Sequence, residues 1–188
     1  MSRSDPFKKK RRSAKETFLL CGEGDREVFF LRHIRKLYSS ENDVAVKIIN
    51  ANGGSVPNMV NYASRLLGEY SRRILVCDSD KPVKEMTKAR EIAINQEIVL
   101  VANSPCVESL FLSILGKNCD NLTSNQCKRK FESEILMNRR SDSVVEYEKI
   151  FTKTLLNTKR HQIENLDKII QIVENGGTGF RERSPIRS

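Results

Sequence analysis

Three carboxylates follow predicted strand ends, and their types and spacing could support phosphoryl chemistry. Glu23 comes shortly after an apolar run at residues 17–21, and Asp78 and Asp80 come directly after a second run at residues 73–77. Two aspartates at this spacing, together with a glutamate from a neighbouring strand, offer the hard oxygen donors that Mg²⁺ or Mn²⁺ prefers. An Asp-x-Asp alone is more often a turn or a helix cap. Glu23 in the equivalent strand-end position favours a metal site, where a bound cation could activate water for phosphodiester hydrolysis.

A fourth carboxylate and two basic residues belong to the same expected site. Glu108 falls in the first turns of an apolar helical segment, residues 107–115, where a buried charge needs a partner or a metal. Arg26 and Lys81 lie next to the carboxylates in sequence and could hold phosphate oxygens. A single basic residue after a strand is more often simply solvated, so this role and the solvated one both stay open.

The elements that must position these residues alternate between strand and helix. Apolar strand-like runs at residues 17–21, 44–49, 73–77 and 97–102 are separated by segments of helical periodicity. Unbroken apolar strands between amphipathic helices indicate an α/β fold, with a four-stranded parallel sheet covered on both faces. Right-handed crossovers bring the carboxyl ends of such strands to one edge. We therefore expect Glu23, Asp78 and Asp80 to converge there.

Beyond residue 103 the pattern becomes helical. Segments 107–115, 125–138, 143–156 and 159–175 have helical spacing of apolar residues, which predicts four helices. The chain is accordingly divided into a basic disordered arm at 1–16, an α/β domain at 17–116, a helical appendage packed on it at 117–177, and a disordered tail at 178–188.

The net charge of +9 is concentrated at the two ends of the chain. Residues 1–16 carry seven basic and two acidic side chains, a net charge of +5. Lys8, Lys9, Lys10, Arg11 and Arg12 of this arm could neutralise phosphates and would make nucleic-acid binding sensitive to salt. A solvated tail that aids solubility is an equally weighted alternative.

The composition indicates where in the cell the protein is expected and which metal and cross-links are not expected. The sequence has no run of 18 apolar residues, and its basic N-terminus has no apolar core of a secretory signal, so we expect a cytoplasmic protein. Five cysteines without a Cys-x-x-Cys pair, and only two histidines, argue against zinc and disulfides.

Two segments resemble the Toprim signature, which is a glutamate after the first strand and an Asp-x-Asp after the third. They are residues 19–24, Leu-Leu-Cys-Gly-Glu-Gly, and residues 74–80, Ile-Leu-Val-Cys-Asp-Ser-Asp. The chain is more closely similar to RloB-like proteins, a Toprim branch found among bacterial anti-phage systems. Those proteins have a basic N-terminus leading into Cys-x-Glu-Gly, a Gly-Gly turn before the second helix, and a segment of the Ser-x-Pro-Cys-Phe-Glu type, which residues 103–112 fill here. The resemblance covers roughly residues 7–116.

The resemblance implies a Toprim, Rossmann-like fold and a Mg²⁺-dependent nuclease acting on DNA or on an RNA such as tRNA. Glu23 would be a metal ligand or the general acid/base, Asp78 and Asp80 metal ligands, and Glu108 a further ligand or an orienting carboxylate. By family analogy, the protein would be a toxin-like effector working with an ATPase partner, and a homodimer is left open. Two alternatives also stay open: a non-catalytic nucleic-acid-binding module, and a subunit that docks a partner within a defence complex.

Overall fold

The computed structural model describes residues 16–39, 44–137 and 143–175 of the chain. Its four strands form one parallel sheet in the order β2-β1-β3-β4. The strands are β1 (Glu16–Gly22), β2 (Val44–Asn50), β3 (Arg72–Asp78) and β4 (Ile98–Asn103). The helices are α1 (Asp25–Tyr38), α2 (Val56–Arg65), α3 (Val83–Asn95), α4 (Val107–Ile114), α5 (Ser124–Glu134), α6 (Val144–Ile150), α7 (Lys153–Arg160) and α8 (Glu164–Asn175). This arrangement confirms the predicted α/β class with a Rossmann-like parallel sheet.

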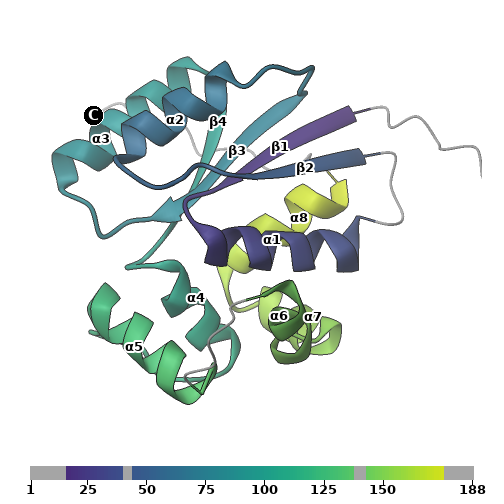
Figure 1. Ribbon diagram of the computed structural model, residues 1–188, viewed down its shortest axis with the longest axis vertical. Helices are drawn as coiled ribbons and strands as arrows, with labels where there is room; N and C mark the ends of the chain where they lie inside the picture. The colour runs from purple at the N-terminus through teal and green to yellow at the C-terminus, as the bar shows by residue number, and fades with distance from the viewer. Residues whose placement is uncertain (1–15, 40–43, 138–142, 176–188) are drawn as a thin grey trace, which may run out of the picture.

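Helices cover both faces of the sheet. Figure 1 shows α2 and α3 on one face and α1 and α8 on the other. Alternate side chains of β1 enter two separate cores: Phe18 and Leu20 pack with α1 and α8, whereas Leu19 and Cys21 pack with α2 and α3. A strand buried on both faces must be apolar at every position, which explains the unbroken apolar runs in the sequence.

The C-terminal helices differ from the prediction. A single helix over residues 143–156 is wrong, because Phe151 leaves the helical conformation at φ −106° and ψ 76° and separates α6 from α7. Thr152 then caps α7, its Oγ1 accepting a hydrogen bond from the backbone N–H of Leu155 at 3.3 Å. The last helix begins at Glu164, not at residue 159. Phe151 is fully buried, so the apolar periodicity continued through the break and hid it.

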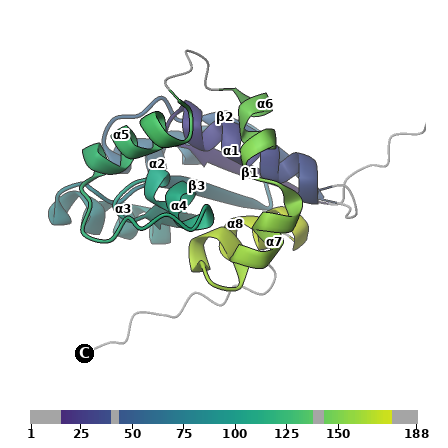
Figure 2. The same ribbon diagram turned by 90° about the horizontal axis from the view of Figure 1, so that it is seen from below.

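An aromatic cluster joins α4, α5 and α6 to α1. The Phe111 ring on α4 lies 5.0–5.5 Å, centroid to centroid, from the rings of Phe30, Phe131, Tyr147 and Phe151. In Figure 2, α4 and α5 lie to one side of the molecule, and α7 and α8 to the other. Because α8 also contacts α1, β2 and β4, part of the region after residue 116 completes one face of the sheet.

The two predicted chain ends lie almost entirely outside the described residues. Apart from Glu16, which begins β1, the predicted basic arm lies outside the described residues, as does the predicted tail. Within the described ranges, no helix has both the length and the apolar character that crossing a membrane requires.

Candidate active site

The carboxyl ends of β1 and β3 bring Glu23 and Asp78 side by side. Gly22 pairs with Val76 in the parallel register, and the backbone N–H of Glu23 donates to the Val76 carbonyl at 3.0 Å. The Glu23 carboxylate then accepts the backbone N–H of Asp78 through Oε2 at 2.9 Å. Residues 55 positions apart in sequence are therefore fixed against each other by the sheet and by one side-chain hydrogen bond.

Helix α4 brings the third carboxylate, Glu108, to the same place. A turn containing the cis peptide between Ser104 and Pro105 leads from β4 into α4. The backbone N–H of Val107 donates to Asp78 Oδ1 at 2.8 Å, which ties the start of α4 to the end of β3. Glu108 is 2% exposed, and its Oε1 accepts a hydrogen bond from Arg26 at 2.6 Å. Its Oε2 is buried and has no hydrogen-bond partner among the described residues.

These carboxylates line one open pocket of about 950 Å³ at the strand ends. Its walls come from the β1–α1 turn, the first turns of α1, the end of β2 and the β2–α2 loop, the end of β3, and helices α4 and α5. The lining residues are Glu23, Gly24, Asp25, Arg26, Glu27, Phe29, Asn50, Asn52, Gly53, Asp78, Glu108 and Lys128. Helix α5 thus contributes Lys128 to a site that is otherwise built from the sheet edge, α1 and α4.

Glu27 is a member of this group that the sequence reasoning missed. It is 5% exposed, and its Oε2 accepts the backbone N–H of the N-cap residue Gly24 at 3.0 Å, which is the glutamate half of a capping box at the start of α1. Burial above all, and also the charges of Asp78 and Glu108, raise the pKa of Glu27 to about 7. The sequence does place a glutamate four positions after Glu23, which could have indicated a further site residue. A glutamate near a helix start is ordinarily solvated, so its burial was not expected.

Close packing explains the glycine that precedes the site. A Cβ atom at Gly22 would lie 2.7 Å from the Cβ of Glu27 and 3.1 Å from the backbone N of Val28. Only a residue without a side chain allows α1 to approach the end of β1 this closely. Gly22 therefore sets the position of Glu27 in the pocket wall.

The carboxylates are close enough to disturb one another. Burial, reinforced by the neighbouring Glu23 charge, raises the pKa of Asp78 to about 6. Two lysines partly compensate for the negative charge: Lys81 Nζ lies 3.2 Å from Glu23 Oε1, and Lys128 Nζ lies 3.6 Å from Asp78 Oδ2. Additional positive charge near these carboxylates would be stabilising.

The other predicted site residues lie in different settings. Asp80 is exposed, is not among the residues that line the pocket, and has Oδ1 3.9 Å from Lys81 Nζ. Arg26, expected to hold phosphate, uses its guanidinium to bridge Glu108 and Glu132 at 2.6 Å each. The predicted phosphate contacts of the arm, Lys8, Lys9, Lys10, Arg11 and Arg12, lie outside the described residues.

The residues fit a divalent cation in their chemistry. Glu23, Asp78 and Glu108 supply only oxygen donors, as Mg²⁺ and Mn²⁺ prefer, and the unpartnered Glu108 Oε2 is a buried oxygen that a cation would satisfy. In the part of the chain that the structure describes, no group of three or more His, Cys, Asp or Glu side chains is already gathered for metal binding. Glu23 and Asp78 are each paired with a lysine, and Glu108 is paired with Arg26.

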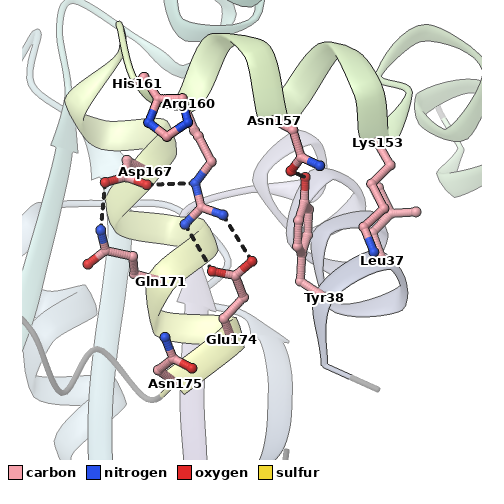
Figure 3. Close-up of a pocket in the computed structure, with 10 residues that line it drawn as sticks. All are labelled: Leu37, Tyr38, Lys153, Asn157, Arg160, His161, Asp167, Gln171, Glu174 and Asn175. Carbon is pink, nitrogen blue, oxygen red and sulfur yellow. Dashed lines mark hydrogen bonds and ion pairs between the residues drawn. The ribbon is translucent and has the colours of Figure 1, made fainter. Parts of the chain in front are cut away.

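A second pocket, of about 750 Å³, lies between α1, α7 and α8 (Figure 3). At its centre, Arg160 donates through Nε to Asp167 Oδ1 at 2.7 Å. Its two terminal nitrogens each donate to one oxygen of Glu174 at 2.9 Å. On the other side of the pocket, Tyr38 donates its hydroxyl proton to Asn157 Oδ1 at 2.8 Å. These contacts join α7 to α8 and to α1, and they give the pocket a structural role.

Comparisons with known proteins find no family model, no curated protein and no solved structure that matches this chain. The similarity to RloB-like Toprim proteins therefore stays a prediction from the motifs.

Proposed function

We propose that the protein is a nuclease that uses Mg²⁺ or Mn²⁺ to hydrolyse phosphodiester bonds in DNA or RNA. The observation that carries this proposal is the convergence of Glu23, Asp78 and the buried, half-partnered Glu108 on one open pocket beside basic side chains. Carboxylates bind the cation and basic groups bind phosphate oxygens in metal-assisted phosphoryl chemistry. The RloB-like resemblance adds the proposal of an anti-phage, toxin-like effector with an ATPase partner.

Each residue has a role that follows from its contacts. Glu23, Asp78 and Glu108 would hold the cation, which when bound supplies an activated water and stabilises charge on the reacting phosphate. The Val107 N–H fixes the Asp78 carboxylate through Oδ1, and Arg26 fixes that of Glu108 through Oε1. These contacts leave Asp78 Oδ2 and Glu108 Oε2 for a cation, and the Asp78 N–H at Glu23 Oε2 leaves Glu23 Oε1 as the third oxygen.

A second function is favoured by a different observation. Because the acidic residues are paired with basic ones and no metal-binding group is assembled within the described ranges, the same pocket would also suit a module that binds nucleic acid without cutting it. Such a module would bind nucleic acid equally well in a chelator, whereas a nuclease would require the cation to cut.

The test is cleavage of plasmid, single-stranded DNA and total tRNA by the purified protein in Mg²⁺, Mn²⁺ or EDTA. The informative variant is Asp78→Asn, which keeps an oxygen to accept the Val107 N–H but removes the charge. The matched control is Asp120→Asn, since Asp120 is exposed and is not among the residues that line the pocket. We expect cation-dependent cutting by the wild type and the control, and a loss of about a hundredfold or more in Asp78→Asn. Equal cutting by both variants would contradict the proposal.

A further inference from the structure

Lys128 approaches the carboxylate pocket from outside the sheet. It belongs to α5, in the region predicted to be a helical appendage packed on the α/β domain, and its Nζ lies 3.6 Å from Asp78 Oδ2. Its neighbours on the helix are firmly anchored: Cys127 and Phe131 are fully buried, and the Phe131 ring packs 5.2 Å from that of Phe111. The backbone that carries Lys128 is therefore fixed, while its side chain is 40% exposed.

The oxygen that Lys128 approaches is the one left for a cation. Asp78 Oδ1 is occupied by the Val107 N–H at 2.8 Å, so Oδ2 is the coordinating atom that Asp78 can offer. The Lys128 side chain carries a lysine ammonium group, which is positively charged at neutral pH, and its Nζ lies 3.6 Å from Oδ2. A positive charge thus already stands at the oxygen that a divalent cation would need.

The two basic residues that line the pocket, Arg26 and Lys128, differ in how tightly they are held. Arg26 bridges Glu108 and Glu132 through two contacts of 2.6 Å and is 23% exposed. Lys128 makes one longer contact through a flexible four-carbon chain, with three donors that can reorient. Arg26 is therefore suited to position Glu108, whereas Lys128 is suited to exchange one anionic partner for another.

We infer that Lys128 is the resident counter-ion of Asp78, that a divalent cation displaces it, and that the released ammonium group then binds a phosphate oxygen of the substrate. The phosphate step rests on the proposed nuclease function, whereas the competition with the cation does not require catalysis. Helix α5 would then be part of the active site, and Lys128 would couple cation binding to substrate binding.

The first test is calorimetric titration of Mn²⁺ into the wild-type protein, Lys128→Ala and Lys128→Gln. Arg129→Ala is the matched control, since Arg129 is the next residue on α5, is exposed and is not among the residues that line the pocket. Removing the competing charge should tighten Mn²⁺ binding by about fivefold or more in both Lys128 variants and leave it unchanged in Arg129→Ala. Thermal melting of each variant shows that the comparison is between folded proteins.

The outcomes separate the two proposals. If the wild type and all variants bind Mn²⁺ with the same affinity, the inference about Lys128 is overturned and the metal site stands. If no variant and no wild-type protein binds Mn²⁺, the metal-dependent function itself fails, and the inference fails with it. If only the Lys128 variants bind Mn²⁺, the competition is supported in its strongest form.

The second test measures substrate phosphate contact without cleavage. Fluorescein-labelled DNA and RNA strands are titrated in Ca²⁺ at a series of salt concentrations, and binding is followed by fluorescence anisotropy. Lys128→Ala should bind more weakly than Arg129→Ala, with a salt-dependence slope smaller by about one unit, as expected for the loss of one phosphate contact. Identical affinities and slopes for the two variants would overturn the phosphate role.

Discussion

Replacement of Glu27 by glutamine should stabilise the folded protein, and more so as the pH rises. The pKa of this carboxyl is raised from its usual value of 4.5 to about 7 in the folded state, because the side chain is buried among like charges. The folded protein therefore holds a proton that the unfolded chain releases between those two values. The stability associated with that proton is fully present below about pH 4.5 and is lost as the pH rises towards 7.

The size of the effect follows from the shift in pKa. A difference of about 2.5 units, at about 1.4 kcal/mol per unit, corresponds to about 3 kcal/mol at pH 8. At pH 5 most of this cost of ionising the buried Glu27 is absent, and about 1 kcal/mol of it remains. Glutamine resembles the protonated acid and still offers an oxygen to the Gly24 N–H. Glu27→Gln should thus exceed the wild type by about 3 kcal/mol at pH 8 and by about 1 kcal/mol at pH 5.

The assay is urea unfolding of both proteins in EDTA at several pH values. Glu85→Gln serves as the control, since Glu85 also accepts a backbone N–H at a helix start, that of Val56 at 2.9 Å, but lies outside the carboxylate pocket. A stability difference between Glu27→Gln and the wild type that does not change with pH, or that reverses in sign, would refute the reasoning. A pH-dependent gain as large in Glu85→Gln would refute it as well.

Three further predictions follow from packing. Gly22→Ala should lower the free energy of unfolding by about 1–3 kcal/mol, because its Cβ would lie 2.7 Å from a neighbouring Cβ, whereas Gly24→Ala should cost less; equal urea midpoints would contradict this. Phe111→Ala should cost about 3–5 kcal/mol in the same assay, since its ring touches four others, and a loss below 1 kcal/mol would refute the central role of the cluster. Burial raises the pKa of the Cys21 thiol to about 12, so Ellman's reagent at pH 8 should leave Cys21 unmodified in the native protein and react first with the partly exposed Cys119. Mass spectrometry after digestion identifies the labelled cysteines, and early labelling of Cys21 would contradict the prediction.

Local sequence was enough to predict the sheet and the meeting of Glu23 and Asp78 at its edge, although not the exposed position of Asp80. The run at residues 17–21 is apolar at successive positions because β1 is buried on both faces, and that pattern distinguishes a central parallel strand from an amphipathic one. Once the strands are parallel, the chirality of the crossovers leaves little choice about where Glu23 and Asp78 meet. Their proximity thus follows from hydrophobic periodicity and chain handedness, both of which are local properties.

Helix boundaries after residue 117 were less predictable. The periodicity of residues 143–156 continues through Phe151, since a buried side chain is required there whether the backbone is helical or not. A threonine at position 152 is a local signal for a helix cap. Whether the chain starts a new helix there or continues the preceding one depends on the packing of the Phe151 ring against Phe30 and Phe111. Tertiary contacts therefore decided where α6 ends.

The partners of the carboxylates were decided by the tertiary structure alone. Asp78 and Asp80 look equivalent in sequence, yet Asp78 ends β3, is buried and accepts the Val107 N–H at the start of α4, whereas Asp80 lies beyond the strand and is exposed. Lys128 contacts Asp78 from a helix 50 residues further along the chain. Glu27 lines the carboxylate pocket only because Gly22, which has no side chain, allows α1 to approach β1. Sequence periodicity reports which face of an element is buried, but the identity of the groups that meet there depends on how distant elements pack.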